Sequence, residues 1–280
     1  MTASLLSAAA PASPGAVLLL PGLCSTPDEL LHLQSALRRS GWHVSAPHIA
    51  GYSFDAERDS QRASGFAQWV DRVCAEFERL KAQHGTVLLA GISAGAALAL
   101  AAVARLGKAV AGVVLMSTTL RMDGWSVRRS RWLLPLALYT PIGLLWRYRE
   151  RAPYGVKNQR VREWIEQELK DRRISRAGCA AIGVGHLREY DRLRRAVRRS
   201  LDRVQCPVLA LHAREDEVAS LSNIDLLANG IKHAPLHTVV LENSYHMISI
   251  DNDRRQVAEE TLEFARTVAQ GRAPSTPTES

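Results

Sequence analysis

Three residues of this chain, Ser93, Asp216 and His246, have the side chains that together turn a hydroxyl group into a nucleophile. A serine hydroxyl reacts poorly on its own, because it needs an exposed position and a base that removes its proton. Histidine supplies such a base, and a carboxylate fixes the tautomer and the orientation of the imidazole. The three residue types therefore indicate acyl transfer, provided that the fold brings them together.

Ser93 is the centre of the pentapeptide GISAG, residues 91–95. The apolar run 87–90 predicts a buried strand and the Ala- and Leu-rich stretch 96–105 predicts a helix, so Ser93 falls at the apex of the turn between them. The two glycines lack Cβ atoms, which lets neighbouring segments approach a strained turn closely. The pentapeptide alone is a weak signal, and its position between a strand and a helix is what indicates an exposed nucleophile.

Asp216 and His246 each follow a run of residues that predicts a strand. Residues 207–212 precede the loop of Asp216, and residues 236–241 precede the loop of His246. Functional groups in open α/β sheets collect at the carboxyl ends of the strands. We therefore expect all three side chains at the same edge of one sheet.

These motifs resemble those of the α/β-hydrolase superfamily, and within it those of the small bacterial carboxylesterases and monoacylglycerol lipases. The resemblance covers about residues 15–117 and 204–268. It implies an α/β fold with a mostly parallel, doubly wound sheet and a helical cap inserted after the sixth strand. That strand would be 110–116 here, because we expect the opening strands of the fold to be reduced or missing in this chain. The matching segments are 17–23, 91–95, 212–218 and 244–251.

The resemblance implies a role for each matching position. Ser93 corresponds to the nucleophile, His246 to the general base and Asp216 to the acid that holds the imidazole. The backbone amides of Leu23 and Ala94 correspond to the two donors of an oxyanion hole.

Two further acidic residues, Glu215 and Glu217, flank Asp216 in the same loop. Each is an alternative carboxylate partner for the histidine. The register of the motif favours Asp216 over both.

Strands and helices alternate along most of the chain, which is typical of a parallel sheet with helices on its faces. One helix has a clear start signal, with Thr26 as N-cap, Pro27 in the first turn and Glu29 three residues after the cap. Strands are predicted at 16–20, 43–46, 87–91, 110–116, 207–212 and 236–241, and helices at 27–39, 65–83, 94–105, 160–173, 187–203, 222–229 and 253–269.

Length and composition suit one large domain with an insertion. We expect a disordered leader at 1–14, a hydrolase core at 15–117 and 204–270, a basic helical cap at 118–203 and a disordered tail at 271–280. The four cysteines are widely spaced, which favours a reducing compartment, the cytoplasm, over a disulfide framework. The motifs imply neither a metal nor an organic cofactor.

The positive charge of the chain is concentrated in the expected cap. Residues 121–203 hold 21 Lys and Arg against 9 Asp and Glu, whereas the remainder holds 15 against 19.

An uncharged run, 132–146, is bracketed by tryptophans and flanked by arginines. It has two interpretations, an element packed over the acyl pocket or an interfacial segment that contacts an anionic membrane. Fifteen residues are too few to span a bilayer, which needs about 20. A nucleic-acid partner is not expected, because acidic residues alternate with the basic ones. Candidate substrate contacts are Cys24, Trp132, Leu136, Tyr139 and Trp146.

Together these features predict a serine hydrolase that cleaves carboxylic esters of apolar acyl groups through an acyl-enzyme on Ser93. The expected partner is a small-molecule ester, with peripheral contact between the cap and an anionic membrane. Two alternatives remain open. One is thioesterase, lactonase or acyltransferase chemistry on the same three residues, and the other is a non-catalytic ligand receptor on the hydrolase scaffold.

Overall fold

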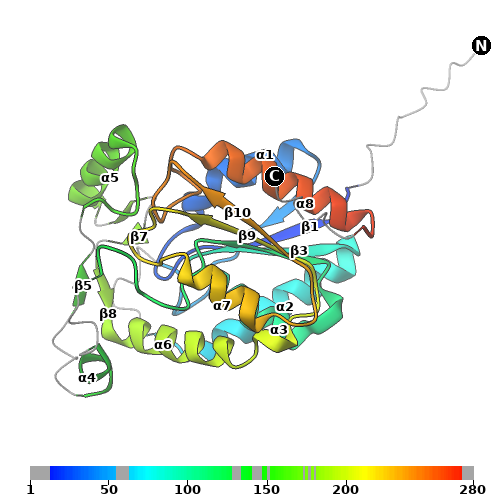
Figure 1. Cartoon of the computed structure of the whole chain (residues 1–280), viewed down its shortest axis with the longest axis horizontal. Helices are drawn as coiled ribbons and strands as arrows, with labels where there is room; N and C mark the ends of the chain where they lie inside the picture. The colour runs from blue at the N-terminus through cyan, green and yellow to red at the C-terminus, as the bar shows by residue number, and fades with distance from the viewer. Residues whose placement is uncertain are drawn as a thin grey trace, which may run out of the picture.

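The computed structural model describes residues 13–54, 63–127, 134–140, 147–149, 152–172, 174–175, 178–179 and 181–272. A parallel sheet of six strands in the order β10-β9-β4-β3-β1-β2 forms its centre (Figure 1). Every strand begins and ends within two residues of its predicted range, so the predicted parallel sheet is confirmed. The strands are β1 (Ala16–Leu20), β2 (His43–Ser45), β3 (Val87–Ile92), β4 (Gly112–Met116), β9 (Val208–Ala213) and β10 (Leu236–Leu241).

The central strands are apolar along their whole length because both faces of the sheet are covered by helices. Successive side chains of a strand point to opposite faces. In β1, Leu18 and Leu20 therefore belong to one buried cluster, whereas Val17 and Leu19 belong to the other.

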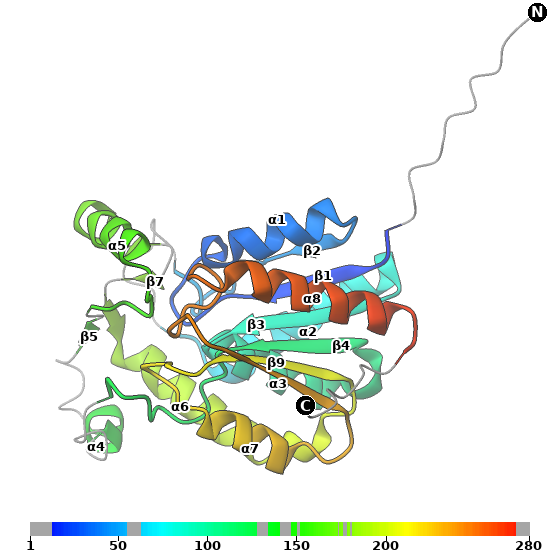
Figure 2. The same cartoon turned by 45° about the horizontal axis from the view of Figure 1, so that its top comes forward.

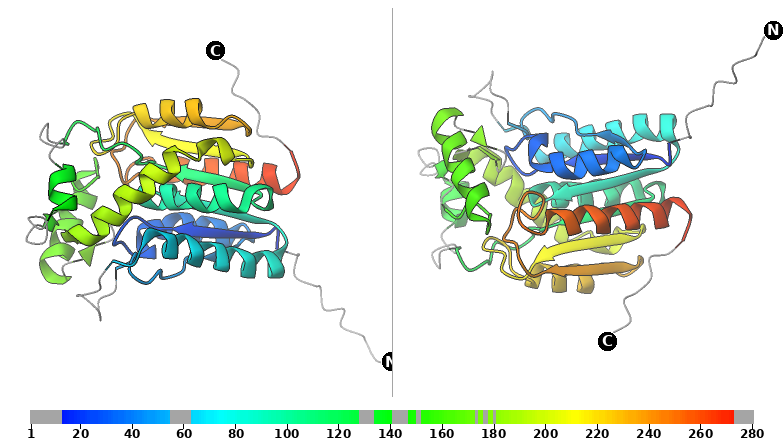
Figure 3. Two further views of the ribbon diagram at one scale, coloured as in Figure 1. Left: turned by 90° about the horizontal axis from the view of Figure 1, so that it is seen from below. Right: turned by 90° about the horizontal axis from the view of Figure 1, so that it is seen from above.

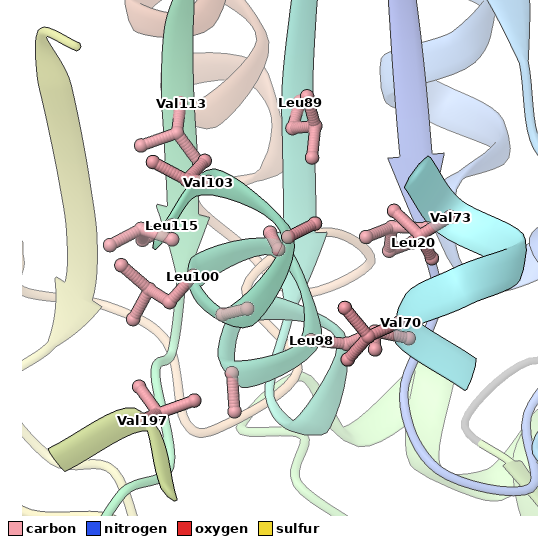
Figure 4. Close-up of a cluster of buried hydrophobic side chains, with 14 of the residues drawn as sticks. Leu20, Val70, Val73, Leu89, Leu98, Leu100, Val103, Val113, Leu115 and Val197 are labelled. Atoms are coloured by element: carbon pink, nitrogen blue, oxygen red, sulfur yellow. The ribbon is translucent and has the colours of Figure 1, made fainter. Parts of the chain in front are cut away.

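Helices cover the two faces unequally (Figure 3). One face carries α2 (Phe66–His84), α3 (Ala94–Leu106), α6 (Val184–Arg198) and α7 (Ser222–Gly230), and the other carries α1 (Leu31–Arg39) and α8 (Arg254–Ala269). The helix α3 lies at the centre of the first layer. In the core close-up, its Leu98 points toward Val70 of α2 and its Leu100 toward Leu115 of β4 (Figure 4).

The predicted helix 27–39 is divided into a 3-10 turn, η1 (Pro27–Leu30), and α1. Pro27 stands in the first turn as expected, but the predicted capping box is wrong. The Thr26 side chain makes no capping hydrogen bond. Glu29 is buried, and its carboxylate accepts hydrogen bonds from the Gly22 amide and the Ser25 hydroxyl.

The segment between β4 and β9 lies largely beyond the carboxyl ends of the strands (Figure 2). Its helices α4 (Leu134–Tyr139), α5 (Gln159–Arg172) and α6 agree with the predicted helical character. Two short antiparallel ribbons are additional, and nothing in the sequence pattern predicted them. They pair β5 (Arg147–Arg149) with β8 (Ala181–Gly183), and β6 (Ile174–Ser175) with β7 (Gly178–Cys179).

The helix α6 belongs to both parts of the molecule. It contacts α4 at the cap, while its Tyr190, Leu193 and Val197 are buried in the main core cluster against α3. The proposed cap of 118–203 is therefore anchored to the sheet layer by its last helix. Residues 1–12 and 273–280, most of the expected leader and tail, lie outside the described residues. Among the helices that are described, none is both long enough and apolar enough to cross a bilayer.

Candidate active site

Ser93 stands at the sharp turn between β3 and α3. Its backbone has φ 56° and ψ −116°, a conformation that non-glycine residues rarely adopt. Gly91 and Gly95 are required because other backbone atoms lie too close to them to leave room for a Cβ atom. A Cβ atom on Gly91 would lie 2.3 Å from the Gly95 carbonyl oxygen, and one on Gly95 would lie 2.1 Å from that of Leu20. The hydroxyl of Ser93 is thus held at the edge of the sheet, half-buried.

His246 follows β10 and places its ring against Ser93. The Nε2 atom lies 2.8 Å from the Ser93 Oγ. The backbone of His246 is held on both sides, because its carbonyl accepts a hydrogen bond from the Ser117 hydroxyl at 2.6 Å and its amide donates to Glu217 at 3.1 Å. These contacts fix the position of the imidazole independently of its side-chain partners.

Asp216 follows β9 and lies on the other side of the imidazole. One carboxylate oxygen is 2.8 Å from the His246 Nδ1, while the amides of Val218 and Ala219 donate to the other oxygen at 2.9 and 2.8 Å. Burial opposes the charge on Asp216, yet the attraction and hydrogen bond of His246 outweigh it and hold the pKa of the carboxyl below its usual value. The structure therefore joins Ser93, His246 and Asp216 in one hydrogen-bonded chain.

The two flanking acids have other partners. Glu215 is half-exposed and forms an ion pair with Lys157 at 2.9 Å. Glu217 is buried and accepts the backbone amide of His246, and burial raises the pKa of its carboxyl. Asp216 is the one acid of this loop whose carboxylate reaches the imidazole ring.

His212, which the sequence places beside the acid loop, is fully buried behind Asp216. Its Nε2 atom is 2.7 Å from the Ala219 carbonyl and 3.4 Å from the Asp216 carboxylate. Burial lowers the pKa of this imidazole. A neutral His212 donates its Nε2 proton to Ala219 and supports the turn that carries Asp216.

The two residues whose amides the resemblance implies as oxyanion donors are Leu23, in the loop after β1, and Ala94, in the first turn of α3. Ala94 opens its helix, so its N–H has no intrahelical acceptor. Within the described part of the chain, neither amide has a hydrogen-bond partner. Their role as oxyanion donors stays a prediction.

The structure describes three of the five expected substrate contacts. The other two, Trp132 and Trp146, lie outside the described residues. Leu136 is 56 % exposed on α4. The hydroxyl of Tyr139 donates to Asp191 of α6 at 2.8 Å, which makes this residue an anchor for α4. Cys24 is buried in the loop after β1 with φ 54°, and its contact with substrate stays a prediction.

Two buried residues near this site were not identified as functional from the sequence. The spacing of Glu29 from Thr26 predicts a capping box instead, and no sequence motif includes Tyr52, whose hydroxyl donates to the Pro21 carbonyl at 2.6 Å. Leu33 and Leu37 follow Glu29 at intervals of four and eight residues, and all three are buried. That helical spacing was the available signal that Glu29 faces inward.

Within the described ranges, no group of three or more His, Cys, Asp and Glu side chains is arranged to bind a metal ion. The arrangement found here is a serine hydroxyl in hydrogen-bond contact with an imidazole that is itself bonded to a buried carboxylate. It suits attack on a carbonyl carbon.

The chain is similar to two known bacterial proteins. The chain is 28 % identical to the thermostable monoacylglycerol lipase of Bacillus sp. (strain H-257) over 251 residues, which cover 90 % of both chains. It is 23 % identical to a carboxylesterase of Bacillus subtilis (strain 168), with 89 % of this chain and 91 % of that protein covered.

The fold has counterparts among solved structures. One structure, from work on the metagenome-derived lipolytic enzymes LipS and LipT, superposes with a TM-score of 0.75 at 24 % identity and covers 91 % of this chain and 95 % of its own. The family model described as Hydrolase_4, serine aminopeptidase S33, matches residues 11–253. The chain is therefore an α/β-hydrolase and belongs to the Hydrolase_4 family.

Proposed function

We propose that this protein is a serine hydrolase that cleaves carboxylic esters through an acyl-enzyme on Ser93. The observation that carries the proposal is the chain of hydrogen bonds from the Ser93 hydroxyl through His246 to Asp216, each 2.8 Å long. The amides of Leu23 and Ala94 supply the second requirement of the reaction, hydrogen-bond donors to the oxyanion.

Acylation begins when the Ser93 Oγ attacks the ester carbonyl carbon and its proton passes to the His246 Nε2. The Asp216 carboxylate stabilises the imidazolium that forms. The carbonyl oxygen becomes an oxyanion, and the amides of Leu23 and Ala94 donate hydrogen bonds to it, each contributing about 3 kcal/mol. When the intermediate collapses, the bond from carbon to the alcohol oxygen breaks, and His246 returns its proton to the leaving alcohol.

Deacylation repeats these steps with water as the nucleophile. His246 takes a proton from the water as its oxygen attacks the acyl carbon. The same two amides stabilise the second oxyanion. The bond to the Ser93 Oγ then breaks, Ser93 regains its proton from His246, and the carboxylic acid leaves.

The proposed substrates are small esters with an apolar acyl group, including monoacylglycerols. Support comes from the monoacylglycerol lipase and the carboxylesterase, which align with this chain over most of its length. The proposed cap, 118–203, lies beyond the strand ends where the site is located, so it limits the size of the acyl group that reaches Ser93.

A peripheral contact with an anionic membrane is part of the proposal. Leu136 and Tyr139 are exposed on α4. The basic helix α6 packs against α4, and the guanidinium groups of Arg188 and Arg195 lie over the ring of Tyr139. Apolar side chains beside arginines suit the boundary between acyl chains and anionic headgroups. The free thiols at Cys74 and Cys206 support a cytoplasmic location.

The test is hydrolysis of p-nitrophenyl esters from acetate to palmitate by the wild type and by Ser93→Ala. We expect turnover that the substitution lowers by at least about 10⁴-fold, because the nucleophile is lost. The preferred chain length measures the space beneath the cap. Hydrolysis that persists in Ser93→Ala contradicts the proposal.

Parallel assays separate the alternative activities. Acyl thioesters, lactones and an aminoacyl p-nitroanilide are offered to the same two proteins. Turnover of one of these, with no turnover of any ester, replaces the proposed substrate class. Tight binding of an ester without turnover indicates a ligand receptor.

A further inference from the structure

The loop that follows β1 uses the backbone amides on both sides of Leu23 for its own hydrogen bonds. The Gly22 amide donates to the Glu29 carboxylate, and the Cys24 amide donates to the Tyr52 carbonyl at 2.9 Å. The Ser25 amide donates to the Gly22 carbonyl at 3.2 Å. Within the described residues, the Leu23 amide has no such partner. The loop is therefore held by the residues on both sides of its free donor.

Glu29 makes the contacts that close this loop on one side. It is 1 % exposed and is carried by η1, directly before the buried face of α1. One carboxylate oxygen accepts the Gly22 amide, and the other accepts the Ser25 hydroxyl at 2.6 Å. A single side chain thus bridges the residue before Leu23 and a residue two positions after it.

A buried carboxylate is costly unless its hydrogen bonds are satisfied. Capping of η1 does not explain Glu29, because its side chain bonds to no amide of that turn. Tyr52 also holds the loop, through both its hydroxyl and its carbonyl. An apolar residue at position 29 would leave the Gly22 amide without this acceptor.

We propose that Glu29 is a positioning residue for the hydrolytic reaction, which holds the loop 21–25 so that the Leu23 amide points at the developing oxyanion. This inference rests on the proposed function of Ser93, because an oxyanion forms only if that serine attacks a carbonyl. Glu29 acts through the loop and touches no reacting atom.

The ionisation of Glu29 agrees with a role inside the site. Burial raises the pKa of its carboxyl to about 7, while the Ser25 hydroxyl, the Gly22 amide and the positive charge of His246 act in the opposite direction. The other titratable group that faces Glu29 is Tyr52, whose pKa burial raises far above its usual value. Glutamine at position 29 retains the oxygen that accepts the Gly22 amide, whereas alanine retains neither acceptor.

The experiment compares Glu29→Ala, Glu29→Gln and Ser25→Ala in the full chain, with kcat and KM measured separately on the best p-nitrophenyl ester. We expect Glu29→Ala to lower kcat by on the order of 100-fold with little change in KM, because the amide helps only the transition state. Glu29→Gln is expected to restore most of the activity. Ser25→Ala, which removes one of the two bonds, is expected to lower kcat severalfold. The matched control is Glu259→Gln on α8, an exposed glutamate paired with Arg255.

Two results overturn the proposal. One is a folded Glu29→Ala variant with the wild-type kcat, and the other is a change confined to KM. If Glu29→Ala does not fold, Ser25→Ala decides the question, and a wild-type kcat in that variant overturns the proposal as well. Circular dichroism and thermal melting establish whether each variant is folded.

A fluorophosphonate probe separates failure of this proposal from failure of the proposed function. The probe phosphonylates an activated serine, and intact-protein mass spectrometry follows the rate without reference to any substrate. If the wild type reacts no faster than Ser93→Ala, the proposed function fails. If the wild type reacts and Glu29→Ala reacts equally fast, only the role of Glu29 fails.

Discussion

Asp216 and Glu217 are neighbours in the chain and both are buried, yet they hold His246 by different atoms. The Asp216 carboxylate contacts the Nδ1 atom of the ring at 2.8 Å, whereas the Glu217 carboxylate accepts the backbone amide at 3.1 Å. The first contact sets the tautomer and stabilises charge on the ring. The second fixes where the ring stands.

This division predicts unequal effects of neutral substitutions. Asp216→Asn is expected to lower kcat by about 10⁴-fold, because an amide favours the wrong tautomer of His246. Glu217→Gln keeps an oxygen that accepts the backbone amide, so we expect a loss of less than about tenfold. Steady-state kinetics check both, with exposed Glu215→Gln as control. An Asp216→Asn variant with wild-type kcat would show that another residue orients the histidine.

The close packing at the serine turn predicts a strong effect of one methyl group. A Cβ atom on Gly95 meets the carbonyl oxygens of Leu20 and Pro21 at 2.1 and 2.5 Å, and these are backbone atoms that have little room to move. We expect Gly95→Ala to lower the free energy of unfolding by about 3 kcal/mol or to prevent folding.

The control for this substitution is Gly183→Ala. At that position φ is −72° and the nearest atom is 3.8 Å away. Urea unfolding compares the two variants. Equal stability of both would contradict the close approach of α3 to the end of β1.

The raised pKa of Glu29 predicts how its stability contribution depends on pH. The carboxyl titrates near 4.5 when unfolded and at about 7 when folded. The folded state therefore binds more protons between these values, and stability falls as the pH rises through about 7. The loss is on the order of 3 kcal/mol.

Glu29→Gln has no such penalty, since its side chain stays neutral. We expect the melting temperature of Glu29→Gln, relative to the wild type, to be several degrees higher at pH 8 than at pH 5. Differential scanning calorimetry at both pH values measures this change. The other titrating groups are the same in both proteins. A difference in melting temperature between the two that does not change with pH would therefore show that Glu29 is not the group with the raised pKa.

The proposed membrane contact predicts that an exposed leucine on α4 contributes to vesicle binding, whereas an exposed leucine on α1 does not. Leu136 on α4 is 56 % exposed and Leu31 on α1 is 40 % exposed. Leu136→Asp is expected to weaken binding to vesicles of anionic phospholipid by at least about tenfold, whereas Leu31→Asp is expected to leave it unchanged.

Flotation of the wild type and both variants at low salt measures this binding. Added salt is expected to release the wild type, because arginines of α6 supply part of the attraction. The contact is absent if the wild type does not float with the vesicles at low salt.

The sheet and the three site residues could be predicted because their signals are local. Parallel strands covered on both faces are continuous apolar runs, and residues 16–20 and 87–92 are of this kind. Asp216 and His246 lie in the loops that follow such runs. The predicted end of each strand therefore also places these two side chains at the edge of the sheet.

The contacts that support these residues could not be predicted because they join distant parts of the chain. The Ser117 hydroxyl binds the carbonyl of His246, which lies 129 positions later. Glu29 has the spacing of a capping box. Its partners, Gly22 and Ser25, lie in the loop 21–25, and the sequence does not show that this loop folds against Glu29. The ribbons of the cap have strands of two or three residues, too short to show an alternating pattern.

Detection of the acyl-enzyme tests the proposed role of Ser93 most directly. The wild type and Ser93→Ala are mixed with p-nitrophenyl butyrate, quenched in acid within milliseconds and analysed by mass spectrometry after proteolysis. We expect a butyryl group on the peptide that contains Ser93, formed in a burst and absent from the variant. An ester that is hydrolysed with no acyl group on Ser93, or with an acyl group on another residue, would contradict that role.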